Sequence, residues 1–131
     1  MRMLDPRRLV GQEGESVAEA HLRRQGYRIV ARNVRSPLGE LDLVAEDGGV
    51  LVFVEVKARR TQDFGGAIHA VHPRKQDKLV RLASQYLAQH HLSNRPCRFD
   101  VVLLQRDPAG NASRIEHIQN AFDVPGDDLR W

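Results

Sequence analysis

Residues 39–57 read Gly-Glu-Leu-Asp-Leu-Val-Ala-Glu-Asp-Gly-Gly-Val-Leu-Val-Phe-Val-Glu-Val-Lys, and this stretch decides the fold of the chain. It predicts two strands, Glu40–Glu46 and Val50–Lys57, joined by the pair Gly48-Gly49. Glycine is favoured at both central positions of a two-residue hairpin loop because both need a positive φ. We therefore expect an antiparallel hairpin. Its second strand is nearly all apolar up to Glu55, which is typical of a strand covered on both faces.

The acidic residues of this hairpin are predicted to meet. Counting outward from the turn places Asp42 opposite Glu55, and Glu40 opposite Lys57. Facing residues point to the same side of a sheet with Cβ atoms about 4.5–5.5 Å apart, so two carboxylates there repel unless a proton or a cation lies between them. A divalent cation held by oxygen ligands is the simplest resolution. A three-residue loop would shift the register and separate the two acids.

Length and composition are those of one ordinary globular domain. The 131 residues are 41% hydrophobic and 28% charged, which is enough apolar material for a real core. The net charge is +3 and the pI is about 9.5, with arginine pairs at Arg7-Arg8, Arg23-Arg24 and Arg59-Arg60. This balance permits a nucleic-acid partner without requiring one.

The sequence also predicts a cytoplasmic protein that does not associate with membranes. The single cysteine, Cys97, excludes an internal disulfide and suits a reducing compartment. Met1–Val10 contains three arginines and no apolar segment, unlike a signal peptide. No apolar run approaches the roughly 18 residues that a membrane helix needs.

Helices and further strands are predicted around the hairpin. Periodicity and turn residues give a first helix closed by Gly26, a first strand, a long polar connection, a second helix and two last strands. The ranges are Leu9–Gln25, Tyr27–Val34, Arg59–Pro73, Pro73 or Arg74 to about His91, Arg98–Gln105 and Arg114–Ile118. Residues 1–122 are expected to form a single domain, and residues 123–131 a loosely held tail.

Glu15 lies within the apolar stripe of the first helix. Gly11, Ala18 and Leu22 form that stripe, and Glu15 stands among them at spacings of three and four residues. Two interpretations stay open at this point. The carboxylate either points toward the sheet, or sits at the edge of the stripe and is solvated.

These residues resemble a known group of enzymes. The helix with Glu15, the Gly-Glu-Leu-Asp strand, the Phe-Val-Glu-Val-Lys strand, Phe64-Gly65 and the helix beginning near Lys75 resemble the PD-(D/E)XK nuclease superfamily. Within it, the chain is similar to the UPF0102, or YraN-like, family from Gly11 to about Phe122. The resemblance implies an α/β fold with a restriction-endonuclease-like α-β-β-β-α-β core, in which helices flank a mixed sheet. Leu41 departs from the pattern, because it replaces the proline that gives the superfamily its name.

The resemblance also implies a site for phosphodiester hydrolysis that depends on Mg²⁺ or Mn²⁺. Asp42, Glu55 and Lys57 correspond to its catalytic residues. Asp42 and Glu55, together with Glu15, correspond to its metal ligands. Glu40 lies on the same face and is expected to support the site by pairing with Lys57.

A nucleic-acid partner, DNA or another nucleic acid, is expected along the second helix. Arg74, Lys78 and Arg81 form a basic stripe there, which is either a solvated face or a contact for phosphates. Lys75 stands where some superfamily members have a further basic or polar residue. Arg59, the first residue of the predicted polar connection, is assigned to the same nucleic-acid contact.

Three functions remain open from the sequence. The leading one is a metal-dependent endonuclease that cuts DNA, including branched or damaged DNA. The first alternative is a nucleic-acid-binding module that keeps a nuclease-like fold without cutting. The second is an interaction protein whose basic helix and tail dock a partner. The acids have a purely structural explanation as well, a charged sheet end at which Lys57 neutralises Glu40 and Glu55.

Other polar residues carry weaker expectations. His69-x-x-His72 and His90-His91 suggest zinc, but no cysteine pair supports such a site. Asp100 is expected to cap or pair locally with an arginine, and the alternative is that it is a further acid of the site. Resolution of branched DNA would require paired active sites and hence a homodimer, although nothing in the sequence marks a dimer face.

Overall fold

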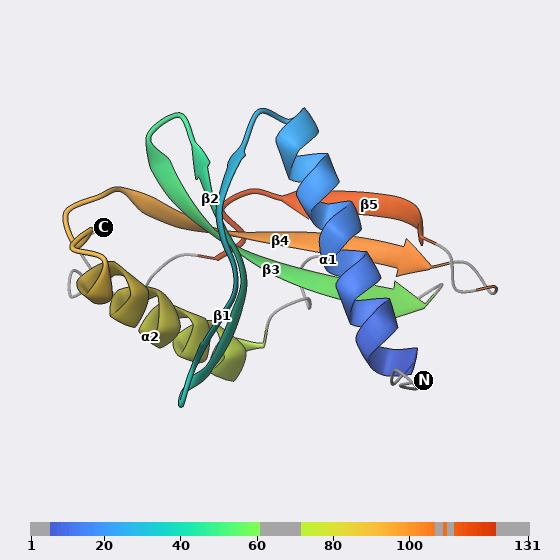
Figure 1. The fold of residues 1–131 in the computed structure, drawn as a ribbon, viewed down its shortest axis with the longest axis horizontal. Helices are drawn as coiled ribbons and strands as arrows, with labels where there is room; N and C mark the ends of the chain where they lie inside the picture. The colour runs from blue at the N-terminus through green and yellow to red at the C-terminus, as the bar shows by residue number, and fades with distance from the viewer. Residues whose placement is uncertain (1–5, 61–71, 107–108, 110–111, 123–131) are drawn as a thin grey trace, which may run out of the picture.

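The structure is a computed structural model that describes residues 6–60, 72–106, 109 and 112–122. Within these described ranges, two helices and five strands follow one another in the order α1-β1-β2-β3-α2-β4-β5 (Figure 1). Their bounds are α1 Pro6–Arg24, β1 Arg28–Ser36, β2 Gly39–Asp47, β3 Val50–Arg60, α2 Pro73–Gln89, β4 Cys97–Arg106 and β5 Ala112–Ile118.

The five strands form one mixed sheet in sequence order. β3 and β4 are parallel and are connected through α2, whereas the other neighbouring strands are antiparallel. A parallel pair needs such a crossover because its strands run in the same direction. The predicted α/β fold class and its α-β-β-β-α-β order are confirmed.

The two helices cover opposite faces of the sheet. Side chains alternate along β3, so that Val52 and Val54 pack beneath α1 while Leu51 and Phe53 pack beneath α2. Figure 1 shows α1 crossing β3 and β4, with α2 lying near the β1–β2 hairpin. The apolar second hairpin strand is therefore covered on both sides, as predicted.

The predicted turn of the central hairpin is confirmed, and the predicted register holds as far as Leu43 and Val54; the ladder ends before the predicted pairs of Asp42 with Glu55 and of Glu40 with Lys57. Gly48 and Gly49 have φ values of 55° and 90°, the positive values that a two-residue loop of this kind requires. Five facing pairs follow, from Asp47 opposite Val50 to Leu43 opposite Val54.

The bounds of several elements differ from the predictions. The largest difference is at Arg59 and Arg60, which were predicted to lie in a connection but extend β3, because β4 supplies ladder partners as far as Arg106. The second helix ends at Gln89, with His90 as its C-cap. The tail, Phe64-Gly65 and His69 lie outside the described residues. No helix in the described part of the chain has the length and apolarity to cross a membrane.

Candidate active site

The site lies where β2 and β3 separate. Their pairing stops at Leu43 and Val54, whereas β2 continues along β1 to Gly39 and β3 continues along β4 to Arg60. Figure 1 shows the β1–β2 hairpin bending away from the other strands. Asp42 and Glu55 are the first residues beyond the last pair, so both acids stand at the opening of a fork.

The side chain of Asp42 lies at the inner end of this fork and hydrogen-bonds across it to β3. Its Oδ2 accepts a hydrogen bond of 2.9 Å from the backbone N–H of Val56. A carboxylate thus satisfies a buried donor where the ladder between β2 and β3 has ended. Burial raises the pKa of Asp42, and the nearby charge of Glu40 raises it further, although the bond from Val56 acts in the opposite direction.

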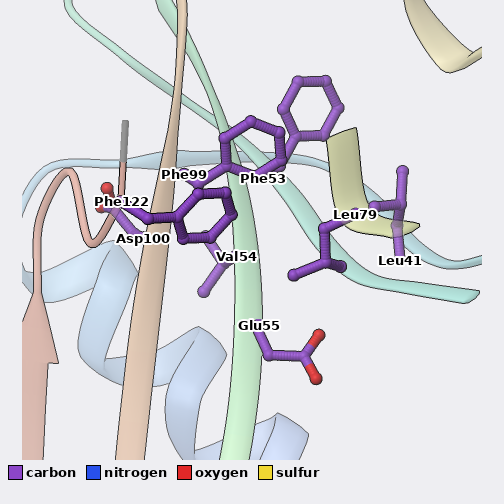
Figure 2. Close-up of a pocket in the computed structure, with 8 residues that line it drawn as sticks. All are labelled: Leu41, Phe53, Val54, Glu55, Leu79, Phe99, Asp100 and Phe122. Atoms are coloured by element: carbon purple, nitrogen blue, oxygen red, sulfur yellow. The ribbon is translucent and has the colours of Figure 1, made fainter. Parts of the chain in front are cut away.

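Glu55 is a buried acid beside another acid. Only 7% of the residue is exposed, and burial together with the charge of Asp42 raises its pKa to about 7. Its nearest cation is Lys75 of α2, whose Nζ lies 3.5 Å from Oε1. Figure 2 shows the carboxyl groups of Glu55 and Asp100 leaving neighbouring strands and pointing away from each other.

Two further carboxylates lie close to Asp42. Ligand atoms of Glu15, Glu40 and Asp42 all lie within 4.8 Å of one another. With its amide nitrogen turned toward them, Asn33 donates to Glu40 at 2.8 Å and to Glu15 at 2.9 Å. Burial raises the pKa of Glu15, as do the charges of Asp42 and Glu40. Of the two interpretations for Glu15, the structure has the one in which the carboxylate points toward the sheet.

This grouping differs from the predicted ligand set. It contains Asp42 and Glu15, but Glu40 takes the place that was assigned to Glu55. The predicted pair between Glu40 and Lys57 does not form, because the strands have already separated at that level. Glu40 instead faces Arg35 across β1 and β2, with 3.9 Å between Oε2 and Nε. The acids therefore extend from Glu15 through Glu40 and Asp42 to Glu55.

Lys57 stands two residues beyond Glu55 on β3. It lowers the pKa of Glu55 through its charge, but it makes no ion pair within 4.0 Å with any described acid. The structural explanation, in which Lys57 neutralises Glu40 and Glu55, is therefore not what the structure has. The ammonium group that pairs with Glu55 belongs to Lys75.

The donor set fits a hard divalent cation. All the side-chain donors are carboxylate oxygens, which Mg²⁺ and Mn²⁺ prefer. Burial raises the pKa values of Asp42, Glu55 and Glu15, the charge of Asp42 raises those of Glu55 and Glu15 further, and the charge of Glu40 raises that of Asp42. Such a group of half-buried acids costs free energy as long as its negative charge is not balanced. Asp42 lies within 4.8 Å of Glu15 and Glu40 and also interacts with Glu55, so it is the best placed ligand.

Basic residues of α2 border the acids. Lys78 lies across the start of β2, and next to it a hollow of about 360 Å³ is lined by Leu38, Arg74, Asp77, Lys78 and Arg81. The side chain of Arg59 lies outside the described residues.

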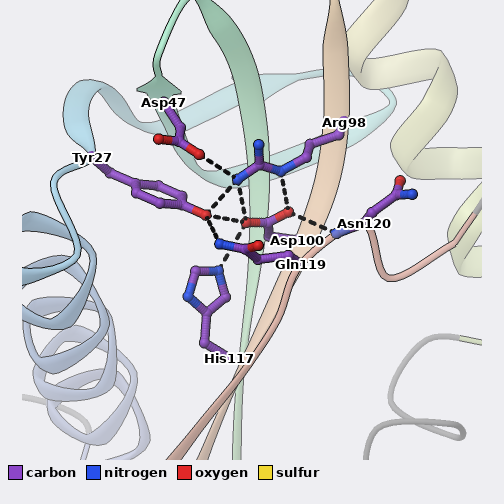
Figure 3. Close-up of polar contacts among 7 residues, drawn as sticks. All are labelled: Tyr27, Asp47, Arg98, Asp100, His117, Gln119 and Asn120. Atoms are coloured by element: carbon purple, nitrogen blue, oxygen red, sulfur yellow. Dashed lines mark hydrogen bonds and ion pairs between the residues drawn. The ribbon is translucent and has the colours of Figure 1, made fainter.

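A second buried carboxylate, Asp100 on β4, belongs to a different network (Figure 3). It accepts hydrogen bonds from Tyr27 at 3.0 Å and Arg98 at 3.0 Å, makes a contact of 2.8 Å with His117, and accepts one from the backbone N–H of Asn120 at 3.0 Å. The predicted pairing with an arginine is confirmed. The other partners could not be recognised in the sequence, because they are 17 to 73 residues away.

Two of the histidines that suggested zinc, His72 and His90, lie at the ends of α2. His72 is the N-cap, and its Nδ1 accepts a hydrogen bond of 3.2 Å from the N–H of Arg74. His90 is the C-cap and stacks near Tyr86, with ring centroids 4.2 Å apart. Among described residues, the only group of three or more potential metal ligands is that of Glu15, Glu40 and Asp42.

Comparison with known proteins identifies the family. The model of the uncharacterised protein family UPF0102 matches residues 14–104, a span from α1 to β4 that includes all the acids of the site. The chain belongs to UPF0102. A UPF0102 protein of Symbiobacterium thermophilum is 54% identical over 115 residues, covering 88% of this chain and 97% of that protein. UPF0102 proteins of Pelotomaculum thermopropionicum and Pseudomonas aeruginosa are 46% and 44% identical, covering 92% and 87% of this chain and 100% and 92% of theirs.

A solved structure with a related arrangement is that of Pyrococcus furiosus SfsA in complex with Ca²⁺. It is 16% identical, the match covers 89% of this UPF0102 chain and 65% of SfsA, and the TM-score is 0.39. At this level the likeness carries no argument about the site.

Proposed function

We propose that this UPF0102 protein is a metal-dependent endonuclease that hydrolyses phosphodiester bonds in DNA, with Mg²⁺ or Mn²⁺ as cofactor. The observation that carries the proposal is the fork between β2 and β3. There Asp42 and Glu55 face each other with raised pKa values, and Lys57 follows two residues later without an ion pair to a described acid. This is the residue set that the resemblance to PD-(D/E)XK nucleases assigns to the reaction.

The acids act by holding the cation. Asp42 and Glu55 are the proposed direct ligands, and Glu15 and Glu40 lie close enough to Asp42 to complete the shell directly or through water. When bound, a divalent ion lowers the pKa of a coordinated water and neutralises charge on the phosphate oxygens. Mg²⁺ keeps several waters, so this sparse set of carboxylates is adequate.

Lys57 has a separate part in the reaction. In the hydrolysis, a water oxygen attacks phosphorus and the bond to the leaving oxygen of the sugar breaks. We assign to the ammonium group of Lys57 the hydrogen bond to the attacking water or to the oxygen that gains negative charge. Because Lys75 already pairs with Glu55, Lys57 keeps its donors for the substrate.

The basic face of α2 supports a nucleic-acid substrate. Arg74, Lys78 and Arg81 lie at spacings of four and three residues on one side of the helix, next to the acids. Cations in such a row bind successive phosphates with little dependence on sequence. The proposal places the activity in the cytoplasm, and action on four-way DNA would further require a homodimer.

The test is cleavage of labelled single-stranded, duplex, flap and four-way DNA with Mg²⁺, Mn²⁺ or EDTA. We expect divalent-dependent cleavage by the wild type, and a loss of roughly 100-fold or more in Asp42→Asn, Glu55→Gln and Lys57→Ala, as for other groups that act on the transition state. Glu116→Gln is the matched control, because this exposed acid of β5 lies outside both the carboxylate cluster and the basic hollow. It should retain wild-type activity.

Two results would reject the proposal. Equal activity in the wild type and the three site variants would show that another protein or another site cuts the DNA. Salt-dependent DNA binding without cleavage in any metal would favour the non-catalytic nucleic-acid-binding module. A metal titration that follows thermal stability separates these cases further. Mn²⁺ should raise the melting temperature of the wild type, whose site is intact, and should not raise that of Asp42→Asn.

A further inference from the structure

A basic hollow lies beside the candidate site, between the turn that joins β1 to β2 and the first turns of α2. It has a volume of about 360 Å³ and is lined by Leu38, Arg74, Asp77, Lys78 and Arg81. Three cations against one carboxylate give its walls a net positive charge. No ion pair between described residues involves any of the three cations. Their charge is therefore available to an anionic ligand.

The hollow adjoins the acids of the site. A Cβ on Gly39, the first residue of β2, would lie 2.7 Å from Cε and 3.3 Å from Nζ of Lys78. Glycine at this position therefore lets Lys78 lie directly over the start of the strand, next to Glu40. Lys75, one helical turn before Lys78, pairs with Glu55. A strand that fills the hollow would continue directly into the fork.

The exposed side chain of Leu38 in the wall of the hollow indicates what class of ligand would bind there. Leu38 is 42% exposed, and among the residues that the structure describes Val30, at 37%, is the other large hydrophobic residue with comparable exposure. A hollow with cations on one side and an exposed leucine on the other suits a ligand that has both a phosphate and a flat apolar surface. A nucleotide has both, but in a duplex the faces of its base are covered by stacking. The base that contacts Leu38 must therefore be unpaired.

We propose that this hollow holds the phosphates and one unpaired base of a DNA strand next to the bond that is cut. The substrate class is then DNA with a single-stranded segment at the cleavage point, such as a flap or a frayed end. This inference rests on the proposed function, because it assigns the substrate of the same site.

The test measures DNA binding by fluorescence anisotropy in EDTA, where no cleavage occurs. The ligands are flap, single-stranded and duplex DNA. Leu38→Ala should weaken binding of the flap and the single strand by roughly fivefold, at the lower end of the effect of losing contact with one base. Its affinity for duplex should not change. Val30→Ala is the matched control, since it removes an equally exposed apolar side chain from β1, and it should leave all three affinities unchanged.

The cations should act on every DNA alike. Lys78→Gln and Arg81→Gln should each weaken binding to all three DNAs and reduce the slope of log affinity against log salt by about one. Far-ultraviolet circular dichroism checks that each variant is folded.

The outcomes separate the inference from the proposed function. An equal loss on duplex and flap in Leu38→Ala, or the same loss in Val30→Ala, overturns the inference even if the wild type cleaves DNA. A loss confined to unpaired DNA supports it. If that loss occurs while no metal supports cleavage, the hollow binds an unpaired base and the hydrolytic function is wrong.

Discussion

Two buried carboxylates on adjacent parallel strands have opposite electrostatic environments. Glu55 on β3 is 7% exposed and Asp100 on β4 is 1% exposed, and in the ladder Glu55 pairs with Val101, the residue after Asp100. Because side chains alternate, Glu55 points to the α2 face and Asp100 to the α1 face. Burial raises the pKa of Glu55 to about 7, whereas the pKa of Asp100 is lowered.

The difference lies in the partners. Burial alone would also raise the pKa of Asp100, but hydrogen bonds from His117, Arg98 and the N–H of Asn120 outweigh it. Glu55 faces the carboxylate of Asp42 and has one lysine 3.5 Å away. A buried acid surrounded by donors stabilises the fold, whereas a buried acid beside other acids costs stability unless a cation binds. Asp100 therefore stabilises the fold, and we propose that Glu55 serves the function.

The largest effect on stability is expected at Asp100. Asp100→Ala should lower the free energy of unfolding by about 3–5 kcal/mol, because it leaves the charge of Arg98 and the donors of Tyr27 and Asn120 without their buried acceptor. Urea denaturation at pH 7.5 measures the change. A loss below about 1 kcal/mol would remove the distinction between the two acids.

Replacing Glu55 is expected to raise the free energy of unfolding, and the size of this gain should depend on pH. The pKa of Glu55 rises from 4.5 to about 7 on folding, so the folded protein binds more protons between these values and ionised Glu55 reduces stability above them. Glu55→Gln should therefore stabilise the metal-free protein at pH 8 by on the order of 2 kcal/mol, and the gain should fall toward zero near pH 4.5.

Urea denaturation of wild type and Glu55→Gln across this pH range, in EDTA, measures that gain. A gain that is the same at pH 8 and at pH 4.5 would show that packing, not ionisation, explains it. A loss of stability at pH 8 would show that the pair with Lys75 outweighs the repulsion by Asp42.

The smallest effect is expected at Lys57. Lys57→Ala should change the free energy of unfolding by less than about 0.5 kcal/mol, because the side chain makes no ion pair with a described acid. The same variant should lose cleavage activity, as proposed above. Measuring unfolding and cleavage on one preparation separates a role of Lys57 in stability from a role in the reaction. A loss of stability as large as that of Asp100→Ala would show that Lys57 has a structural role.

Much of the fold could be predicted because its signals are local. Gly48-Gly49 fixed the turn, and the turn fixed the register as far as Leu43 and Val54. The end of β3 at Arg60 could not be predicted, since it depends on β4, whose partner residues lie more than 40 positions away. The network of Asp100 was missed for the same reason.

The candidate site was predicted in its members but not in all of its contacts. The prediction continued the ladder between the two hairpin strands past the point where they separate, and it therefore paired Glu40 with Lys57. In the structure Glu40 faces Arg35 and lies near Glu15, and the cation that reaches Glu55 comes from α2. Sequence periodicity could not show that Lys75 reaches Glu55, because Lys75 is distant from Glu55 in the chain and only the packing of α2 brings the two together.

The sequence by itself determined the order of helices and strands, the hairpin register and the identity of the acids at the end of it, because each follows from residues that are close in the chain. Only the tertiary structure decided that β2 and β3 separate after Leu43 and Val54, that Lys75 rather than Lys57 pairs with Glu55, and that Leu38 and α2 enclose a basic hollow. These features depend on how sheet twist and helix packing bring distant segments together, and no local pattern encodes that geometry.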